Sequence, residues 1–314
     1  MRILFFLLHI AIIFVPEKKY TKKVKKVNQK PVTYQGKLDG KWEHHHLRSK
    51  VGIEHNYISH PSAKENSPVL VMIHGMTIDS RIYMNLAPLS SNYTLVAYNF
   101  PSRSPLYDGT LTAFTGMVYD FIKAKHFKKP VIMGTSFGAV VAVNLTANFN
   151  DRVNAPAVIL TGTGITGNNE RVRENNIKTA EWLKELPDYK VYWLMEKLVK
   201  NSDNLEKPDK NESHAYLGDV FEMKSVQYYR QVVYATQRYN SVTDLSNITI
   251  PVLVFQGEED GLFEKKQTYA MTNYLKNVDI KFIKNGSHSV VYAQGKKVSA
   301  IISDFCSKES RFRK

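Results

Sequence analysis

The segment Gly134-Thr135-Ser136-Phe137-Gly138 constrains the fold of this chain more than any other. It follows the apolar run 130–133 and precedes a second apolar run, 139–143, which together predict a strand, a tight turn and a helix. Glycines two residues before and two residues after the serine let neighbouring backbone pass close to the turn. Ser136 should then stand clear of the sheet at a helix start, where backbone N–H groups and the helix dipole face a developing negative charge.

A serine hydroxyl is a weak nucleophile until a base takes its proton, and the base needs an orienting carboxylate. Two later segments supply these groups at predicted strand ends. The apolar run 251–256 leads into Gly257-Glu258-Glu259-Asp260-Gly261, and the run 278–283 leads into Asn285-Gly286-Ser287-His288-Ser289. Upstream, the run 68–73 ends in His74-Gly75-Met76, a loop that can offer a second donor to an oxyanion.

With these motifs in this order, the chain resembles the α/β-hydrolase family from about residue 50 to residue 306. The resemblance implies an α/β fold with a mostly parallel central sheet, flanking helices and a helical cap. It implies Ser136 as nucleophile, His288 as general base and then acid, and Asp260 as the orienting carboxylate. The oxyanion hole would be the backbone N–H groups of Met76 and Phe137, and the structural residues of the site would be His74, Gly75, Gly134 and Gly138. No cofactor and no metal are expected.

The acid has two close competitors, because Glu258 and Glu259 precede Asp260. The family usually places its acid three residues after the glycine that closes this strand, which favours Asp260. Some relatives carry the acid after the preceding strand, but here the run 157–160 leads into Thr161-Gly162-Thr163-Gly164, which contains no carboxylate. The loop 99–104 lacks the glycines that many relatives have there, so the sequence leaves the subfamily open.

The alternation of predicted strands and helices is interrupted between residues 166 and 243, where no strand is predicted. Helices are predicted at 168–186, 189–200 and 224–239, with a polar connection at 201–213. We therefore expect a core at 31–165 and 244–306, a helical cap at 166–243, a leader with a basic segment at 1–30 and a basic tail at 307–314. The cap is rich in aromatic residues. These either pack the cap onto the sheet or line a pocket that prefers a hydrophobic group.

The formal net charge of +14 is concentrated at the two ends of the chain. Residues 1–30 hold eight Lys or Arg and one Glu, and the tail holds four basic residues and one Glu, so that little net charge remains between them. A basic patch over the folded core is therefore unsupported, and no nucleic-acid partner is expected. The three consecutive histidines at 44–46 point alternately to opposite faces of an extended segment, which argues against a metal site.

The run 3–15 is apolar except for one histidine, and seven lysines follow it by residue 30. Its length suits the apolar part of an export signal and is short for a bilayer-spanning helix. Positive charge directly after it resists translocation and favours attachment to an anionic membrane surface. Membrane association is the preferred interpretation, and export after cleavage is the alternative. The single cysteine, Cys306, excludes a disulfide within the chain and leaves the compartment open.

Together these features predict a serine hydrolase that acts on small or lipid-like carboxylic esters with a hydrophobic acyl or aryl group. Thioester hydrolysis, carbon–carbon bond hydrolysis and acyl transfer on the same three residues remain alternatives. A dehalogenase or an epoxide hydrolase is disfavoured, because those relatives carry aspartate at the position of Ser136. A binding protein without catalytic activity is disfavoured because such members usually lose one of the three residues.

Overall fold

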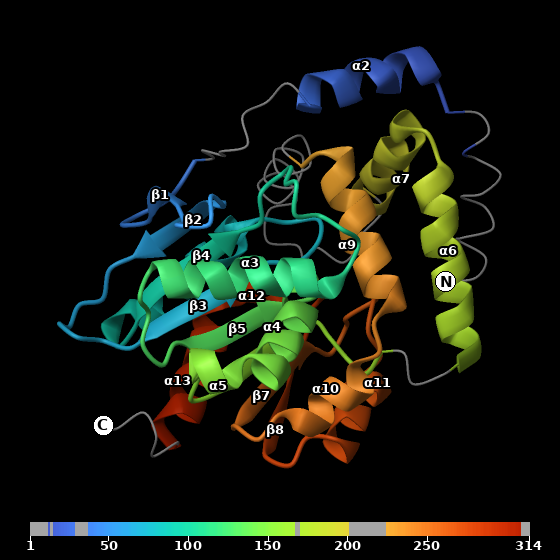
Figure 1. Cartoon of the computed structure of the whole chain (residues 1–314). Helices are drawn as coiled ribbons and strands as arrows, with labels where there is room; N and C mark the ends of the chain where they lie inside the picture. Colours follow the sequence, from blue (N-terminus) through green and yellow to red (C-terminus); the bar gives the residue numbers. More distant parts are fainter. Residues whose placement is uncertain (1–11, 13–14, 29–36, 167–169, 201–223, 309–314) are drawn as a thin grey trace.

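A computed structural model describes residues 12, 15–28, 37–166, 170–200 and 224–308 (Figure 1). One eight-stranded sheet forms the centre, with the strand order β1-β2-β4-β3-β5-β6-β7-β8. Strand β2 runs antiparallel to β1 and β4, and all the other neighbours are parallel. The strands are β1 Glu43–Arg48, β2 Glu54–His60, β3 Val69–Ile73, β4 Thr94–Asn99, β5 Val131–Thr135, β6 Val158–Thr161, β7 Val252–Gly257 and β8 Val278–Ile283.

The central strands are mainly apolar because helices cover both faces of the sheet. Alternate residues of β3 enter different cores, Val71 and Ile73 on one face and Leu70 and Met72 on the other. The first face is covered by α3 Leu111–Ala124, α4 Phe137–Asn148 and α10 Ser241–Asn247. The second is covered by the 3-10 helix η2 Ser80–Ser91, α12 Val290–Ala293 and α13 Gly295–Lys308. The predicted fold class, an α/β fold with a mostly parallel sheet between helices, is confirmed.

Among the described residues, three helices precede α10 in the segment between β6 and β7, at the place of the predicted cap: α6 Glu170–Glu185, α7 Asp188–Lys200 and α9 Val226–Arg238. They stand together beside the sheet (Figure 1). The predicted polar connection at 201–213 lies outside the described residues. Three further short elements are described: α5 Asn150–Val153, α11 Lys265–Tyr269 and η3 Ala270–Asn273.

Helix α2, Glu17–Asn28, packs across the cap helix α7 (Figure 1). Its inner side buries Tyr20, Val24 and Val27, whose spacing of four and three residues places them on one helix face. The Tyr20 hydroxyl donates to the buried carboxylate of Glu196 at 2.7 Å. Within the described part of the chain, no helix is long and apolar enough to cross a membrane. Residues 17–28 of the basic segment thus form a packed amphipathic helix.

Candidate active site

The turn between β5 and α4 holds Ser136 in an unusual backbone conformation. Its φ is 55° and its ψ is −117°, in the positive-φ region that residues other than glycine rarely adopt. The surrounding structure holds it there, because the Ser136 N–H donates to the carbonyl of Thr161 on β6 at 2.9 Å. Strained residues of this kind cluster at active sites.

The two glycines of the turn allow close backbone contacts that no other residue would permit. A Cβ atom at Gly138 would lie 1.9 Å from the carbonyl oxygen of Ile73, and one at Gly134 would lie 2.2 Å from that of Gly138. Both distances are far inside van der Waals contact. The spacing of glycines around Ser136 therefore has a packing cause: the start of α4 lies directly against the end of β3.

His288 and Asp260 are joined by a hydrogen bond. The Nδ1 atom of His288 lies 2.9 Å from Oδ2 of Asp260. The other carboxylate oxygen accepts the backbone N–H groups of Leu262 at 2.8 Å and Phe263 at 3.1 Å. The Asp260 side chain is 1% exposed and that of His288 is 15% exposed. The carboxylate is thus fixed in one orientation, and the imidazole ring is held by it.

The pKa of Asp260 is lowered from its ordinary value. Burial by itself raises the pKa of this carboxyl, but the hydrogen bond and the charge of His288, together with the two backbone donors, outweigh burial. The carboxylate is therefore ionised at neutral pH. Glu258 and Glu259 are exposed instead, and Glu258 pairs with Lys265 at 3.0 Å.

The loops that carry Asp260 and His288 are fastened to each other. The N–H of Glu258 donates to Ile283 and that of Glu259 donates to Gly286, at 3.0 and 2.8 Å. A Cβ atom at Gly257 would lie 2.1 Å from the carbonyl oxygen of Gly286, so the two backbones touch. This contact fixes the distance between the acid and the imidazole.

Short backbone segments bring these groups to Ser136. Gly162, which follows the Thr161 carbonyl bonded to Ser136, has a φ of 57°, and a Cβ atom there would lie 2.9 Å from the His288 ring. A Cβ atom at Gly75 would lie 3.2 Å from the Cβ of Ser136. The structure thus brings Ser136, His288, Asp260 and the loop after β3 to one place.

The loop after β3 is held by buried polar contacts. The Nε2 atom of His74 accepts the N–H of Phe100 at 3.2 Å, and its Nδ1 lies 2.6 Å from the carbonyl oxygen of Gly75. An imidazole that accepts at Nε2 and donates at Nδ1 is neutral. Burial accordingly lowers the pKa of His74 well below its usual range, and the nearby charge of Lys224 acts in the same direction. Met76, the third residue of this loop, is half-buried.

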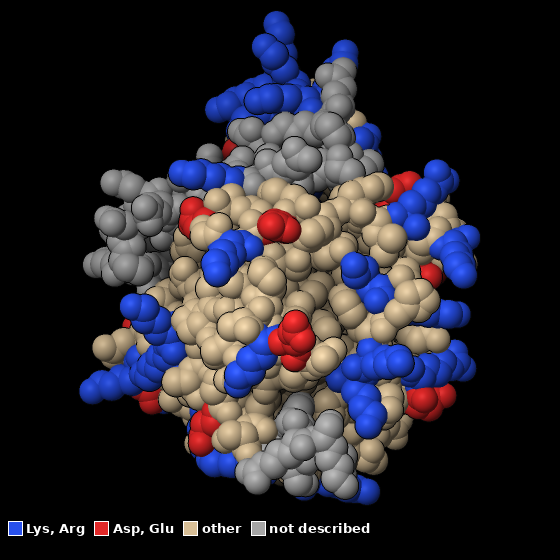
Figure 2. Space-filling view, turned by 90° about the vertical axis from the view of Figure 1, so that its left-hand side faces the viewer, with Lys and Arg blue, Asp and Glu red and all other residues tan. Residues whose placement is uncertain are grey.

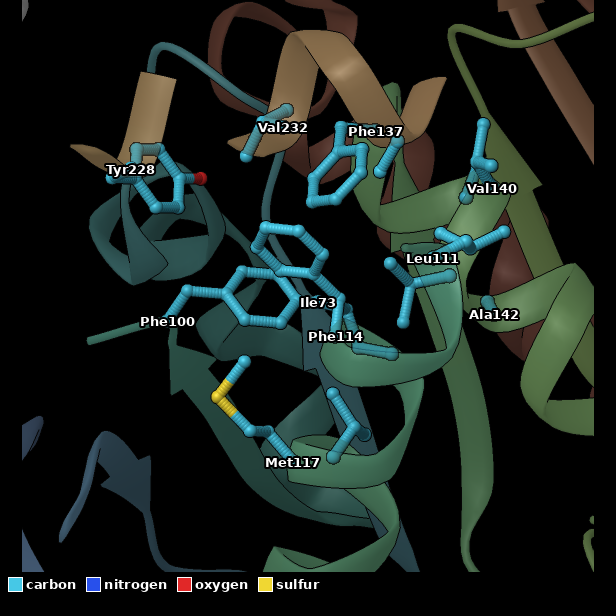
Figure 3. Packing of buried hydrophobic residues seen from close by; sticks show 14 of the residues in the cluster. Ile73, Phe100, Leu111, Phe114, Met117, Phe137, Val140, Ala142, Tyr228 and Val232 are labelled. Carbon is cyan, nitrogen blue, oxygen red and sulfur yellow. The ribbon is translucent and has the colours of Figure 1, made fainter. Parts of the chain in front are cut away.

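A group of aromatic side chains lies beside the turn (Figure 3). The ring of Phe137 meets those of Phe114 and Phe100, with centroid distances of 4.9 and 5.7 Å. Tyr228 from the cap helix α9 meets Phe114 at 6.4 Å. The cap aromatics that the structure describes are mostly buried in the core, as packing predicts, and include Tyr192, Trp193, Tyr228 and Tyr229. Four apolar or aromatic residues of the predicted cap at 166–243 lie outside the described residues: Tyr216, Leu217, Phe221 and Met223.

Comparison with known proteins identifies the family. The model of the S33 serine aminopeptidase family matches residues 64–294, well over half of the chain. The protein is an α/β-hydrolase of this family. A curated relative of this α/β-hydrolase, the proline iminopeptidase PfmaB of Pestalotiopsis fici, is 23% identical over 254 residues, which cover 72% of this chain and 87% of the relative. The protein is thus an enzyme of hydrolase type.

Two solved structures show how widely the same fold is used. A membrane phospholipase A, described as a bacterial virulence factor, superposes with a TM-score of 0.67 and 17% identity, covering 97% of this α/β-hydrolase and 96% of that chain. The enol-lactonase of Burkholderia xenovorans gives the same TM-score and identity, with coverages of 84% and 100%. At these identities the likeness concerns the fold.

Three contributors to the site were not predicted from the sequence. Gly162 lies against the His288 ring. The ring of Phe263 stacks on the same imidazole, with 6.0 Å between the ring centroids. Lys224 is buried near His74. The position of Phe263 three residues after Asp260 was an available signal, since such a turn brings its N–H to the carboxylate.

Away from the site, His45 bonds Ser59 and His46 pairs with Glu54. Among the described residues there is no cluster suited to a metal ion.

Proposed function

We propose that this hydrolase is a serine esterase that cleaves carboxylic esters with a hydrophobic acyl or aryl group through an acyl-enzyme intermediate. One observation carries the proposal. The imidazole of His288 is bonded to the buried Asp260 carboxylate and lies against the backbone segment that also holds the strained turn of Ser136. An imidazole that a carboxylate orients beside a serine can take the proton of the serine hydroxyl, which supports the proposal.

In the proposed mechanism, Ser136 Oγ attacks the ester carbonyl while Nε2 of His288 takes its proton. Asp260 holds the Nδ1–H and stabilises the imidazolium. The tetrahedral oxyanion accepts the N–H groups of Met76 and Phe137; the latter is the first N–H of helix α4, which has no partner inside the helix. His288 then protonates the departing alcohol. Water attacks the acyl-enzyme by the same route and releases the acid.

The aromatic group around Phe137 supports a hydrophobic acyl or aryl moiety, because apolar side chains line most small-molecule sites. Thioesterase, carbon–carbon hydrolase and acyltransferase activities use the same three residues and remain alternatives.

A second candidate function is removal of an N-terminal residue from peptides, as the name of the Pestalotiopsis fici relative suggests. Such a substrate presents an ammonium group, which needs a carboxylate partner. The buried cap carboxylate of Glu196 is already bonded to Tyr20 and Lys23, and the ammonium of Lys224 lies 4.6 Å from the centroid of the Tyr228 ring, beside the aromatic group. These charges favour a neutral or anionic substrate over a cationic one.

A fluorophosphonate probe is expected to label Ser136, because an activated serine attacks phosphorus as it attacks an ester carbonyl. The adduct is located by mass spectrometry. Chromogenic esters of graded chain length are then compared with thioesters and with proline 4-nitroanilide. Turnover should be highest for the esters. Labelling at another serine, or a preference for the anilide, would contradict the proposal.

We further propose that helix α2 attaches the enzyme to anionic membrane surfaces. Five lysines on its outer side are exposed, and Lys and Arg side chains gather at the top of the molecule, where this helix lies (Figure 2). These lysines are Lys18, Lys19, Lys22, Lys25 and Lys26. Basic helices bind anionic lipid surfaces mainly through such charges. Export after cleavage of the segment is the alternative.

Replacing Lys18, Lys22 and Lys25 together by Gln in the full chain should weaken binding to phosphatidylserine-containing vesicles by on the order of 100-fold, at about 1 kcal/mol per lysine. Vesicle sedimentation measures this. Deletion of the helix is a poorer test, because it would uncover the buried face of α7. Replacing three exposed lysines elsewhere, Lys276, Lys296 and Lys297, should leave binding intact. Equal losses in both variants, or a mature protein that lacks the helix, would contradict the proposal.

A further inference from the structure

Lys224 is a buried cation at the junction of the cap and the sheet. The residue is 5% exposed, and its ammonium donates to the carbonyl oxygen of Phe100 at 2.9 Å. An ammonium has three N–H donors. Among the described residues, the structure records no further hydrogen bond and no ion pair for this group. Burial lowers the pKa of Lys224 to about 8, opposed by the charge of Asp79, so the group remains largely protonated at neutral pH.

The hydroxyl of Tyr228 is a second buried polar group with hydrogen-bonding capacity left over. The residue is 0% exposed, and within the described part of the chain its oxygen forms no hydrogen bond. The Lys224 ammonium lies over the Tyr228 ring, 4.6 Å from its centroid, so the two polar groups are close neighbours. In Figure 3 the hydroxyl points to the side of Val232 and Phe137.

Both groups lie next to the candidate site. Phe100, whose carbonyl oxygen binds Lys224, donates its N–H to His74 in the loop after β3. Its ring lies 5.7 Å from that of Phe137, the residue after Ser136. An ammonium with two N–H groups left over and a hydroxyl without a partner among the described residues are thus beside the aromatic group that lies next to Ser136.

A purely structural role for this lysine is poorly supported. Ser225 already ties the same point of the cap to the core, since its N–H donates to the Ser102 hydroxyl at 3.0 Å and its own hydroxyl donates to the Ser102 carbonyl. A neutral side chain would fill the place of Lys224 without the cost of burying a charge. Buried charges are normally paired. Buried N–H and O–H donors that lack an acceptor within the protein therefore suggest that a ligand supplies one.

We propose that Lys224 and Tyr228 form a subsite for a carboxylate at the far end of the substrate's apolar acyl group. The carboxylate accepts one N–H of the ammonium and the tyrosine hydroxyl, while the methylene chain lies along Phe100 and Phe137. The preferred substrates are then esters of dicarboxylic acids in which one carboxyl group is free. The proposal rests on the esterase function proposed above and specifies its substrate class.

The test compares two 4-nitrophenyl esters of equal chain length, the hexanoate and the adipate monoester, which differ by a terminal carboxylate. The wild-type enzyme should favour the adipate ester in kcat/KM by roughly tenfold or more, the range expected for a charge-assisted hydrogen bond. The ratio should fall to about one in Lys224→Met, decrease in Tyr228→Phe and persist in Lys224→Arg. Each ratio compares kcat/KM for the two esters on the same variant. A loss of activity that affects both esters equally therefore leaves the ratio unchanged.

Lys178→Met is the matched control, since Lys178 is an exposed lysine of the cap helix α6, and its ratio should equal that of the wild type. Ligand binding is measured separately on Ser136→Ala protein as the shift of the melting temperature. Free adipate should raise the melting temperature of Ser136→Ala more than hexanoate does. This difference should vanish in the double variant that also carries Lys224→Met. That comparison tests the subsite even if ester turnover fails. Equal ratios and equal shifts for the two ligands in the presence of Lys224 would overturn the proposal.

Discussion

Ser136→Ala is expected to lower kcat for ester hydrolysis by about a million-fold, as removal of the nucleophile does in serine hydrolases that work through three coupled residues. The physical reason is that no acyl-enzyme can form. Background turnover from the oxyanion donors and from substrate binding alone should remain about 1,000 to 10,000-fold above that in water. Single-turnover assays with a chromogenic ester measure both quantities.

The fold should survive this substitution. Alanine keeps the Cβ atom and meets the same positive φ of 55° as serine, so the strain of the turn is unchanged. The melting temperature should therefore stay near that of the wild type, and Ser246→Ala, which alters an exposed hydroxyl on α10, should change neither turnover nor melting. A Ser136→Ala enzyme that retains substantial turnover would place the nucleophile elsewhere.

The turn around Ser136 could be predicted from the sequence because its constraints are local. The glycines at 134 and 138 lie within two residues of the serine, and each is required by a backbone contact that the strand, turn and helix themselves create. The order of Asp260 and His288 after later strands was predictable for a related reason: parallel strands place their carboxyl ends at one edge of the sheet. Burial and the two backbone donors then distinguish Asp260 from its exposed neighbours Glu258 and Glu259.

The contacts that the sequence did not reveal join residues far apart in the chain. Lys224 reaches Phe100 across 124 positions, and Tyr20 reaches Glu196 across 176. Such long-range contacts leave no pattern in the local sequence, so they could not be predicted from it. The packed face of α2 was a partial exception, since Tyr20, Val24 and Val27 follow helical spacing. The seven lysines that follow the apolar run predict a membrane-binding surface, whereas the buried inner face of the helix was not predicted.

Asp260→Asn is expected to lower kcat by roughly 10,000-fold while leaving the fold intact. The amide keeps the size of the side chain, but its NH2 group can donate to His288 Nδ1, which favours the tautomer that carries its proton on Nε2. That tautomer cannot accept the serine proton. In the wild type the lowered pKa of Asp260 keeps the carboxylate ionised, so it accepts the proton on Nδ1 and leaves Nε2 as the acceptor that the proposed mechanism requires.

Glu258→Gln and Glu259→Gln are the matched controls, because both carboxylates lie within two residues of Asp260 and are exposed. Each should retain kcat within a few-fold of the wild type, since neither side chain has a recorded contact with the His288 ring among the described residues. Steady-state kinetics on one ester, with circular dichroism to check folding, compare the three variants. A wild-type rate in Asp260→Asn together with a collapsed rate in Glu258→Gln or Glu259→Gln would assign the orienting carboxylate to that glutamate. The hydrogen bond of 2.9 Å and the two backbone donors on Asp260 argue for the opposite outcome.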